Sequence, residues 1–233
     1  MYTLYIANKN YSSWSLRPWL LMRALGIPFE ERLVPLEDGS CWDSYRTFSP
    51  NGRVPCLHDG ATVVWDSLAI VEYLAERHAG AWPENAETRA WARSVASEMH
   101  SGFGALRERC SMNCGLRIEL AEIPDALQAD IARIDEIWSE GRTRFGGPWL
   151  AGPEFSAADA FYAPVVFRVQ TYGLPLSDAA RAYADLLLGH AAMVEWYRAG
   201  LAEPWRETSH EDEVQSAGAI VADYRQETSQ PGD

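Results

Sequence analysis

The sequence is poor in several features that would assign it to a particular class of protein. Only four of its 233 residues are Cys, and its 20 basic residues are outnumbered by 33 acidic ones. Four Cys are too few for a disulfide scaffold of this length, so we expect reduced thiols and a cytoplasmic protein. A formal charge of −13 argues against nucleic acid as a partner, because phosphate binding needs a basic face.

Long apolar runs are also missing. No run reaches the roughly 18 apolar residues that a membrane span needs, so we expect no membrane partner. Met1–Tyr5 carries no basic residue and precedes no apolar core, so we expect no signal peptide. In contrast, 47% of the residues are hydrophobic and ten are Trp, which is enough to build a sizeable core.

The first 80 residues alternate short strand-like and helix-like segments. Asp59-Gly60 separates two apolar runs, which is typical of a two-residue β-hairpin. The order β-α-β-short helix-β-β-α predicts a small α/β domain over residues 1–80. Strands are expected at Tyr2–Ala7, Glu30–Val34, Val54–His58 and Ala61–Trp65, and the two longer helices at Ser15–Leu25 and Asp66–Arg77.

A stretch with Gly and Pro, Gly80–Thr88, predicts a linker, and after it the pattern becomes helical. We expect an all-α domain over residues 88–206 without strands. Residues 207–233 hold one basic and seven acidic side chains, which predicts a solvated extension rather than a docking segment, with a short helix at Ala217–Tyr224. The helices of the second domain are expected at Arg89–Cys110, Asp125–Arg144, Ser156–Tyr172, Asp178–Leu188 and Ala191–Leu201.

Three serines, Ser12, Ser13 and Ser15, lie between the first strand and the first helix. Ser15 is the expected N-cap, and Pro18 falls in the first turn, where the missing N–H costs little. The N-terminus of a helix also favours an anion, including a thiolate, and lowers its pKa. On this segment alone, capping is the favoured interpretation, and stabilisation of an anion is the alternative.

Two further segments allow either a structural or a binding role. A cis Val54–Pro55 bond would leave the Val54 N–H and C=O for a ligand, but trans bonds are far more frequent before proline. Asp66-Ser67 opens a helix and is suited either to capping it or to holding the ammonium and carboxylate of a free amino-acid end.

Other chemistry-bearing residues have structural interpretations. Ser156 and Asp159 have the spacing of a capping box, so both are predicted to be structural. Cys110 and Cys114 are expected on one face of a helix, but no His pair has suitable spacing beside them, so we predict no metal site. Cys56 follows a strand-opening proline and is predicted to be a core residue.

In their order along the chain, these segments resemble the cytosolic glutathione transferase superfamily over residues 1–206. The resemblance implies a thioredoxin-like first domain with Pro55 in cis, an all-α second domain, and a homodimer. Ser12-Ser13-Trp14-Ser15 occupies the place of the thioredoxin C-x-x-C motif, which disfavours dithiol chemistry. The segment is similar to the zeta-class motif of two serines, a cysteine, a serine, a variable residue and an arginine, but Trp14 replaces the cysteine.

The resemblance also implies roles for individual residues. Ser12, with the adjacent Ser13 as the alternative, would donate a hydrogen bond to the glutathione thiolate. The Val54 backbone would pair with the cysteinyl part of glutathione, and Arg17 would support the loop or neutralise an acidic group. The expected glutathione-binding residues are Trp14, Arg53 for the glycine carboxylate, Val54, Pro55, and Asp66 with Ser67 for the γ-glutamyl end.

The second substrate would bind between the two domains. Arg168 is a candidate for this pocket, although the surface of a helix is its favoured place. The function implied is a glutathione transferase acting on a small electrophile, with glutathione as co-substrate and no metal. The alternatives are a glutathione-dependent isomerase of the maleylacetoacetate type or a peroxidase, and a non-catalytic interaction protein of the same fold. The expected pocket residues are Trp14, Phe103, Leu106, Arg107, Arg168 and Tyr172.

Overall fold

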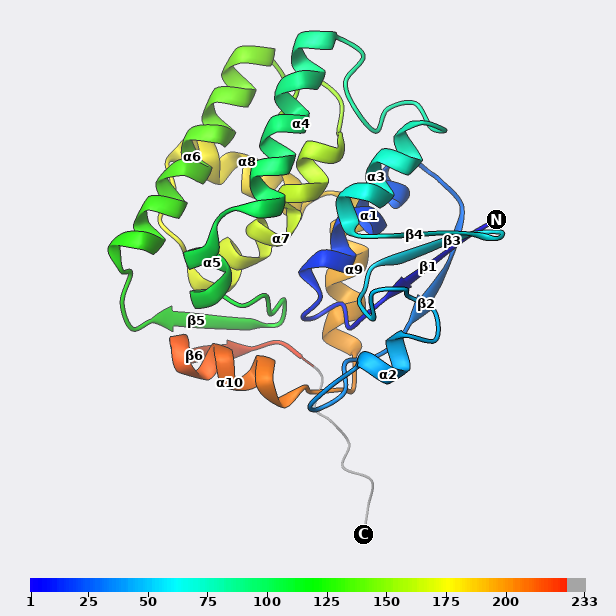
Figure 1. Ribbon diagram of the computed structural model, residues 1–233. Helices are drawn as coiled ribbons and strands as arrows, with labels where there is room; N and C mark the ends of the chain where they lie inside the picture. Colours follow the sequence, from blue (N-terminus) through cyan, green and yellow to red (C-terminus); the bar gives the residue numbers. More distant parts are fainter. Residues whose placement is uncertain (226–233) are drawn as a thin grey trace.

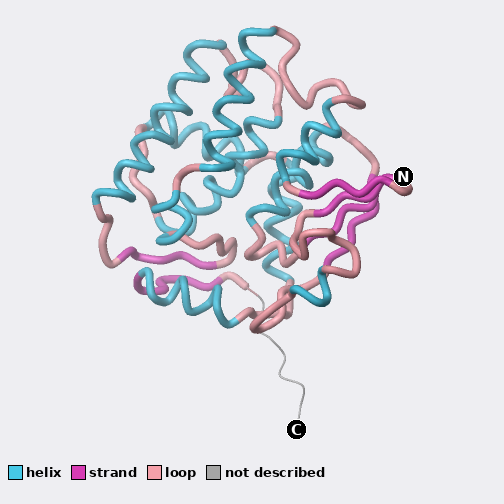
Figure 2. The backbone as a smooth tube through the Cα atoms, viewed as in Figure 1, coloured by secondary structure: helices cyan, strands magenta, loops and turns pink. Residues whose placement is uncertain are grey.

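The computed structural model describes residues 1–225 and has two parts, a small sheet domain and a larger helical one (Figures 1 and 2). The first contains a four-stranded sheet with the strand order β2-β1-β3-β4. β1 and β2 are parallel, and the other neighbours are antiparallel. The strands are β1 (Tyr2–Ile6), β2 (Phe29–Leu33), β3 (Cys56–Asp59) and β4 (Thr62–Trp65).

Three helices complete the first domain in the order that the sequence predicts. They are α1 (Ser13–Ala24), α2 (Trp42–Tyr45) and α3 (Ser67–Ala75). The Asp59-Gly60 hairpin forms as expected, and Gly60 has a φ of +59°, which few residues other than glycine adopt. α1 packs against α3 on one side and against the second domain on the other, so its N-terminus lies near the boundary between the domains.

The second domain is mainly helical, as the sequence predicts. The expectation that residues 88–206 contain no strand is wrong, because Leu116–Leu120 is a strand that pairs with the C-terminal segment. Four of its expected helices form with bounds within one residue of the prediction. The helices up to the end of this domain are α4 (Ala86–Ser101), α5 (Gly104–Arg109), α6 (Asp125–Phe145), α7 (Ala157–Tyr172), α8 (Asp178–Leu188) and α9 (Ala191–Ala202). In the described part of the chain, residues 1–225, no helix is both long and apolar enough to cross a membrane.

The prediction of one continuous helix over Arg89–Cys110 is wrong. The helix ends at Ser101, because Gly102 is extended and Phe103 adopts a left-handed conformation with a φ of +58°. Cys110 then ends α5, and Cys114 lies in the loop beyond it, so the two do not share a helix face.

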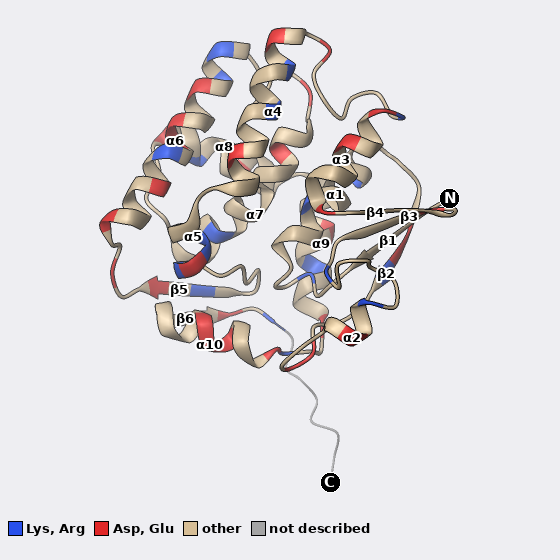
Figure 3. Cartoon of the chain, in the orientation of Figure 1, with Lys and Arg blue, Asp and Glu red and all other residues tan. Residues whose placement is uncertain are grey.

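The acidic segment after residue 206 was expected to be a solvated extension, and this expectation is wrong for the described residues. It forms α10 (Thr208–Ala217) and β6 (Gly218–Asp223), and β6 pairs antiparallel with β5 (Leu116–Leu120). A strand therefore replaces the short helix expected at Ala217–Tyr224, because the segment finds a partner edge in the preceding domain. In Figure 3 the positions of acidic residues are red along α10. Residues 226–233 lie outside the described part.

The start of α7 is held by the predicted pair of Ser156 and Asp159. The Ser156 N–H donates to Asp159 Oδ2 at 2.9 Å, and Leu150 N–H and the Tyr183 hydroxyl each donate to Oδ1 at 3.0 Å. Asp159 is fully buried. Burial raises the pKa of Asp159 to about 6, although these hydrogen bonds oppose the shift. One carboxylate thus joins α7, α8 and the loop before them.

We expect Asp159→Ala to lower the free energy of unfolding by about 3 kcal/mol, because it leaves buried donors without an acceptor. Asp178→Ala is the matched control, since Asp178 is an exposed acid in the first turn of α8. It should change the free energy by less than about 0.5 kcal/mol. Denaturant titration at pH 7 measures both, and equal effects would contradict a central role for Asp159.

Candidate functional site

A cavity of about 460 Å³ lies where the N-terminus of α1 meets the helical domain and the C-terminal segment. Its walls come from the loop before α1, the loop around α2, the turn before β3, the loop after α5, α7 and α10. The lining residues are Tyr11, Ser12, Ser13, Trp14, Leu36, Gly39, Ser40, Cys41, Trp42, Tyr45, Gly52, Arg53, Val54, Ser111, Met112, Arg168 and His210.

Ser12 and Ser13 line this cavity at the N-terminus of α1. The helix starts at Ser13, so Ser12 is the N-cap position and the prediction of Ser15 as N-cap is wrong. Ser15 is buried inside the first turn, where its hydroxyl accepts from the Ala7 N–H at 3.2 Å. The half-buried Ser12 donates to the Ser15 hydroxyl at 2.7 Å. Both partners are hydroxyls that can donate as well as accept, so their roles can reverse and leave the Ser12 hydrogen for the cavity.

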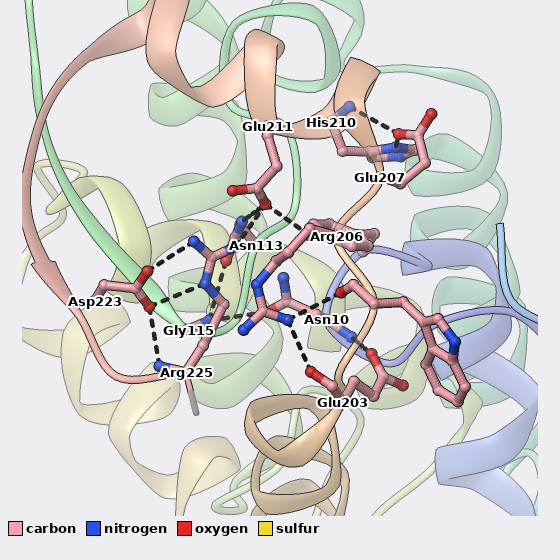
Figure 4. Close-up of polar contacts among 12 residues, drawn as sticks. Asn10, Asn113, Gly115, Glu203, Arg206, Glu207, His210, Glu211, Asp223 and Arg225 are labelled. Carbon is pink, nitrogen blue, oxygen red and sulfur yellow. Dashed lines mark hydrogen bonds and ion pairs between the residues drawn. The ribbon is translucent and has the colours of Figure 1, made fainter. Parts of the chain in front are cut away.

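The loop that carries these serines is clasped by the helical domain. Glu203, just after α9, accepts from the backbone N–H groups of Lys9 at 2.6 Å and of Asn10 at 3.1 Å (Figure 4). The Trp196 indole N–H donates to the Lys9 carbonyl at 2.8 Å, and Gly115 N–H donates to Asn10 Oδ1 at 3.1 Å. Burial raises the pKa of Glu203 to about 7, against the opposing effect of the two N–H groups.

The turn before β3 forms another part of the wall. The Val54–Pro55 bond is cis, as the family resemblance implies, and Val54 lines the cavity with the exposed Arg53. Pro55 itself is buried and lies outside the lining. Gly52 has a φ of +61°, and a Cβ there would lie 2.6 Å from the Trp42 ring, so only glycine fits beneath this tryptophan.

Asp66 and Ser67 lie at the start of α3 but do not line the cavity as it stands. Asp66 has a φ of +73°, and its Oδ1 accepts from the Leu68 N–H at 2.8 Å, so it caps the helix. Its other oxygen, Oδ2, lies 3.5 Å from His100 Nε2. Ser67 is buried, and its hydroxyl accepts from Arg17 at 3.4 Å.

Arg17 is fully buried between the two domains. Its guanidinium lies 4.1 Å from the centre of the Trp14 ring and 4.9 Å from that of Phe161. Within residues 1–225, Nε and Nη2 of Arg17 have no hydrogen-bond partner. Burial lowers the pKa of Arg17 well below its ordinary value, and the charges of Arg107 and Arg168 add to the effect. Stacking on two rings thus compensates part of the cost of this buried cation.

Trp14 and Arg168 are the predicted second-substrate residues that reach the cavity. The prediction of a helix surface for Arg168 is wrong: it is 4% exposed, and its Nε donates to the Cys110 carbonyl at 2.7 Å. Burial, and then the charge of Arg107, lower the pKa of Arg168 to about 10. It therefore remains a cation at neutral pH, beside the cavity.

The other four residues expected in this pocket lie elsewhere. Leu106 is fully buried, and Phe103 packs edge-on against Tyr162 in the core. The Tyr172 hydroxyl donates to the Ser111 carbonyl at 2.7 Å, while Arg107 binds carbonyl groups at the end of α4. Phe103, Leu106 and Arg107 follow the break in the expected helix at Gly102, Tyr172 ends α7, and none of the four lines the cavity.

Several lining residues were not anticipated from the sequence. Cys41 and Trp42 come from the loop around α2, Ser111 and Met112 from the loop after α5, and His210 from α10. The spacing of His210 three residues after Glu207 is a possible signal, but only once a helix is expected there. In the described residues, no cluster of three or more His, Cys, Asp and Glu side chains is arranged to hold a metal ion.

Glu203 generates a pH-dependent prediction. The pKa of Glu203 is about 7 in the folded protein and ordinarily 4.5. Between pH 4.5 and 7, Glu203 therefore keeps its proton in the folded protein but has lost it in the unfolded chain. The stability of the wild type relative to Glu203→Gln should therefore fall by up to about 3 kcal/mol as the pH rises from 4.5 to 7. The exposed Glu154→Gln is the control and should run parallel to the wild type in denaturant titrations at each pH. A constant difference for Glu203→Gln would contradict the prediction.

Comparisons with known proteins match both domains of the chain. Models of the glutathione S-transferase N-terminal and C-terminal domains match residues 11–77 and 119–199. Glutathione S-transferase GstB of Escherichia coli is 26% identical over 190 residues, covering 72% of this chain and 85% of its own length. Maleylacetoacetate isomerase of Rattus norvegicus is 26% identical over 182 residues, covering 75% of this chain and 81% of its own.

A solved structure of a Burkholderia glutathione transferase homologue with bound glutathione has the same fold. It superimposes with a TM-score of 0.62 at 23% identity and covers 85% of this chain and 97% of its own. Two matched domain models in the expected order, on the expected fold, identify the family. The chain belongs to the cytosolic glutathione transferase superfamily.

Proposed function

We propose that the protein is a glutathione transferase in which Ser12 stabilises the thiolate of glutathione. The observation that carries the proposal is the Ser12 hydroxyl, which lies in a cavity at the N-terminus of α1 and shares it with Val54 beside a cis proline. The Tyr11 hydroxyl donates at 2.6 Å to the Glu211 carboxylate, which can only accept, whereas the partner of Ser12 is the Ser15 hydroxyl, which can also donate. When Ser15 donates to the Ser12 oxygen, the Ser12 hydrogen is available to the thiolate.

The cavity is suited to hold glutathione in one direction. The Val54 backbone would pair with the cysteinyl residue, and Arg53 would attract the glycine carboxylate at the open end. Asp66 and Ser67 would receive the γ-glutamyl end at the N-terminus of α3, where the helix dipole favours a carboxylate. Glutathione bound in this way would bring its sulfur to the start of α1.

The energy required is modest. A free thiol has a pKa near 8.5, and lowering it by about two units corresponds to roughly 2.7 kcal/mol. A hydrogen bond to a charged acceptor contributes about 1.5–3 kcal/mol, and a helix terminus adds up to about 1 kcal/mol. The thiolate then attacks an electrophilic carbon, a C–S bond forms, and the leaving group departs with the bonding electrons. Trp14 and Arg168 would contact this second substrate.

An isomerase acting on maleylacetoacetate is the second candidate, because the isomerase of Rattus norvegicus is among the similar proteins. Trp14 distinguishes this chain from the zeta-class motif. Its ring is held between Arg17 and Arg107, at 4.1 and 4.9 Å from their guanidinium carbons, where the zeta class has a small thiol. We therefore favour the transferase and propose, with it, a homodimer in the cytoplasm. Assay of the purified protein with maleylacetoacetate distinguishes the two activities.

We expect Ser12→Ala to lower kcat for an activated aryl halide at least tenfold at pH 7, because the bound thiol loses its hydrogen-bond donor. Ser13→Ala is the matched control, since Ser13 lines the same cavity one residue later, and it should change kcat less than threefold. The pH dependence of kcat should shift upward in Ser12→Ala alone. Equal and small effects of the two substitutions would show that neither hydroxyl stabilises the thiolate.

Glutathione binding tests the proposal without a choice of electrophile. The wild type should be retained on immobilised glutathione, and millimolar glutathione should raise its Tm. Oxidised glutathione that has been hydrolysed to its amino acids serves as the blank. A protein that shows neither retention nor a shift in Tm would support the non-catalytic interaction protein instead.

A further inference from the structure

His210 of the C-terminal segment lies in the cavity that holds Ser12. Its ring packs against that of Tyr11, the residue before Ser12, with centroids 5.1 Å apart and the planes tilted by 37°. Both His210 and Ser12 line the cavity. The proposed function uses Ser12 as a donor to the thiolate but assigns no group to receive the proton that the thiol releases.

Glu207, one turn earlier, orients the imidazole (Figure 4). His210 Nδ1 lies 2.5 Å from Glu207 Oε2, and the carboxylate side chain is 7% exposed. Burial alone would raise the pKa of Glu207, but hydrogen bonds from His210 and Ser209 outweigh it and hold the pKa below its ordinary value. Glu207 is therefore ionised at neutral pH and can only accept hydrogen bonds. Nδ1 must carry the hydrogen, which leaves Nε2 of a neutral His210 as a base.

The segment that carries Glu207 and His210 is held to the rest of the molecule by several contacts. The Thr208 N–H donates to Asp38 Oδ1 at 3.0 Å, which joins the start of α10 to the loop before α2. Glu211 accepts from the Tyr11 hydroxyl and from Arg225, whose Nη1 lies 2.5 Å away. These contacts, together with the pairing of β6 with β5, hold the imidazole at the cavity rather than leave it on a solvated tail.

We propose that His210, oriented by Glu207, accepts the thiol proton of glutathione as the thiolate forms. The proposal rests on the function proposed above and names the base that it lacks. The S–H bond breaks, its electron pair stays on sulfur beside Ser12, and the proton binds His210 Nε2. The imidazolium is stabilised by the Glu207 carboxylate and returns the proton to solvent through its exposed face, since the side chain is 28% exposed. This is the arrangement in which a carboxylate orients a histidine base toward a nucleophile.

The charged and titratable groups that line the cavity with His210, or that contact its helix, come from several elements. Glu207 and Glu211 belong to its own helix, and Arg168 lies across the cavity on α7. The others are Tyr11 before α1, Asp38 and Cys41 around α2, Arg53 before β3, and Arg225 after β6.

Two conservative variants test the proposal by the pH dependence of kcat with an activated aryl halide and saturating glutathione. The wild-type profile should fall on the acid side, because the reaction stops when the thiol keeps its proton. In His210→Gln this acid limb should move to higher pH, because the thiol then has no neighbouring base to receive its proton, and kcat at pH 7 should fall about tenfold. In Glu207→Gln kcat at pH 7 should also fall, because the carboxylate no longer holds the hydrogen on His210 Nδ1 or stabilises the imidazolium.

The controls separate this role from a structural one. His78 contacts Tyr2 and is not among the residues that line the cavity. His78→Gln should therefore leave the pH profile of kcat unchanged. The Kd for glutathione, measured by calorimetry, should stay within threefold of the wild type in each variant. A purely structural loss would scale the whole profile without moving the limb.

The outcomes are distinct for the two proposals. A wild type that binds glutathione and turns over, with an acid limb that does not move in His210→Gln, overturns the role of His210 and leaves the proposed function intact. A wild type that neither binds glutathione nor turns over overturns both. A shift of the limb to higher pH in His210→Gln, together with a lower kcat in Glu207→Gln, supports the proton transfer.

Discussion

The carboxylate of Glu203 is the contact on which the geometry of the cavity depends. It accepts two consecutive backbone N–H groups, those of Lys9 and Asn10, and so joins the end of α9 to the loop that enters α1. A loop of this length would otherwise adopt many conformations, and fixing each residue costs about 1–2 kcal/mol of conformational entropy. Because Glu203 is buried with its partners, the position of Ser12 becomes a property of the interface between the domains.

The burial of Arg17 imposes a second constraint on the residues around the cavity. Arg17 is a buried cation whose neighbours include the aromatic rings of Trp14 and Phe161 and the hydroxyl of Ser67. Leaving such a charge without contacts inside the protein would be costly, so the rings are held close to it. Trp14 therefore has two tasks, because one face of its ring covers Arg17 while the side chain also lines the cavity. The departure from the zeta-class motif at this position is thus tied to the packing of Arg17.

Two acidic residues near the C-terminal end of the chain have a structural role. Glu207 and Glu211 contribute to the net charge of residues 207–233, yet both are engaged inside the structure, with His210 and with Arg225. Their side chains are only 7% and 18% exposed. A composition that suggests solvation therefore builds one wall of the candidate site.

The sequence by itself determined the two-domain order, the β-hairpin at Asp59-Gly60, four long helices of the second domain, and the capping of α7 by Ser156 and Asp159. These features depend on spacing and on residues close together in the chain, so local patterns are enough to predict them. The break at Phe103, the burial of Arg168, and the strand formed after Ala217 were decided only by the tertiary structure. Each depends on a partner more than 50 residues away or on a backbone conformation that packing selects, as when β6 pairs with β5. The same reason explains why the serines could be found in the sequence, whereas His210 beside them could not.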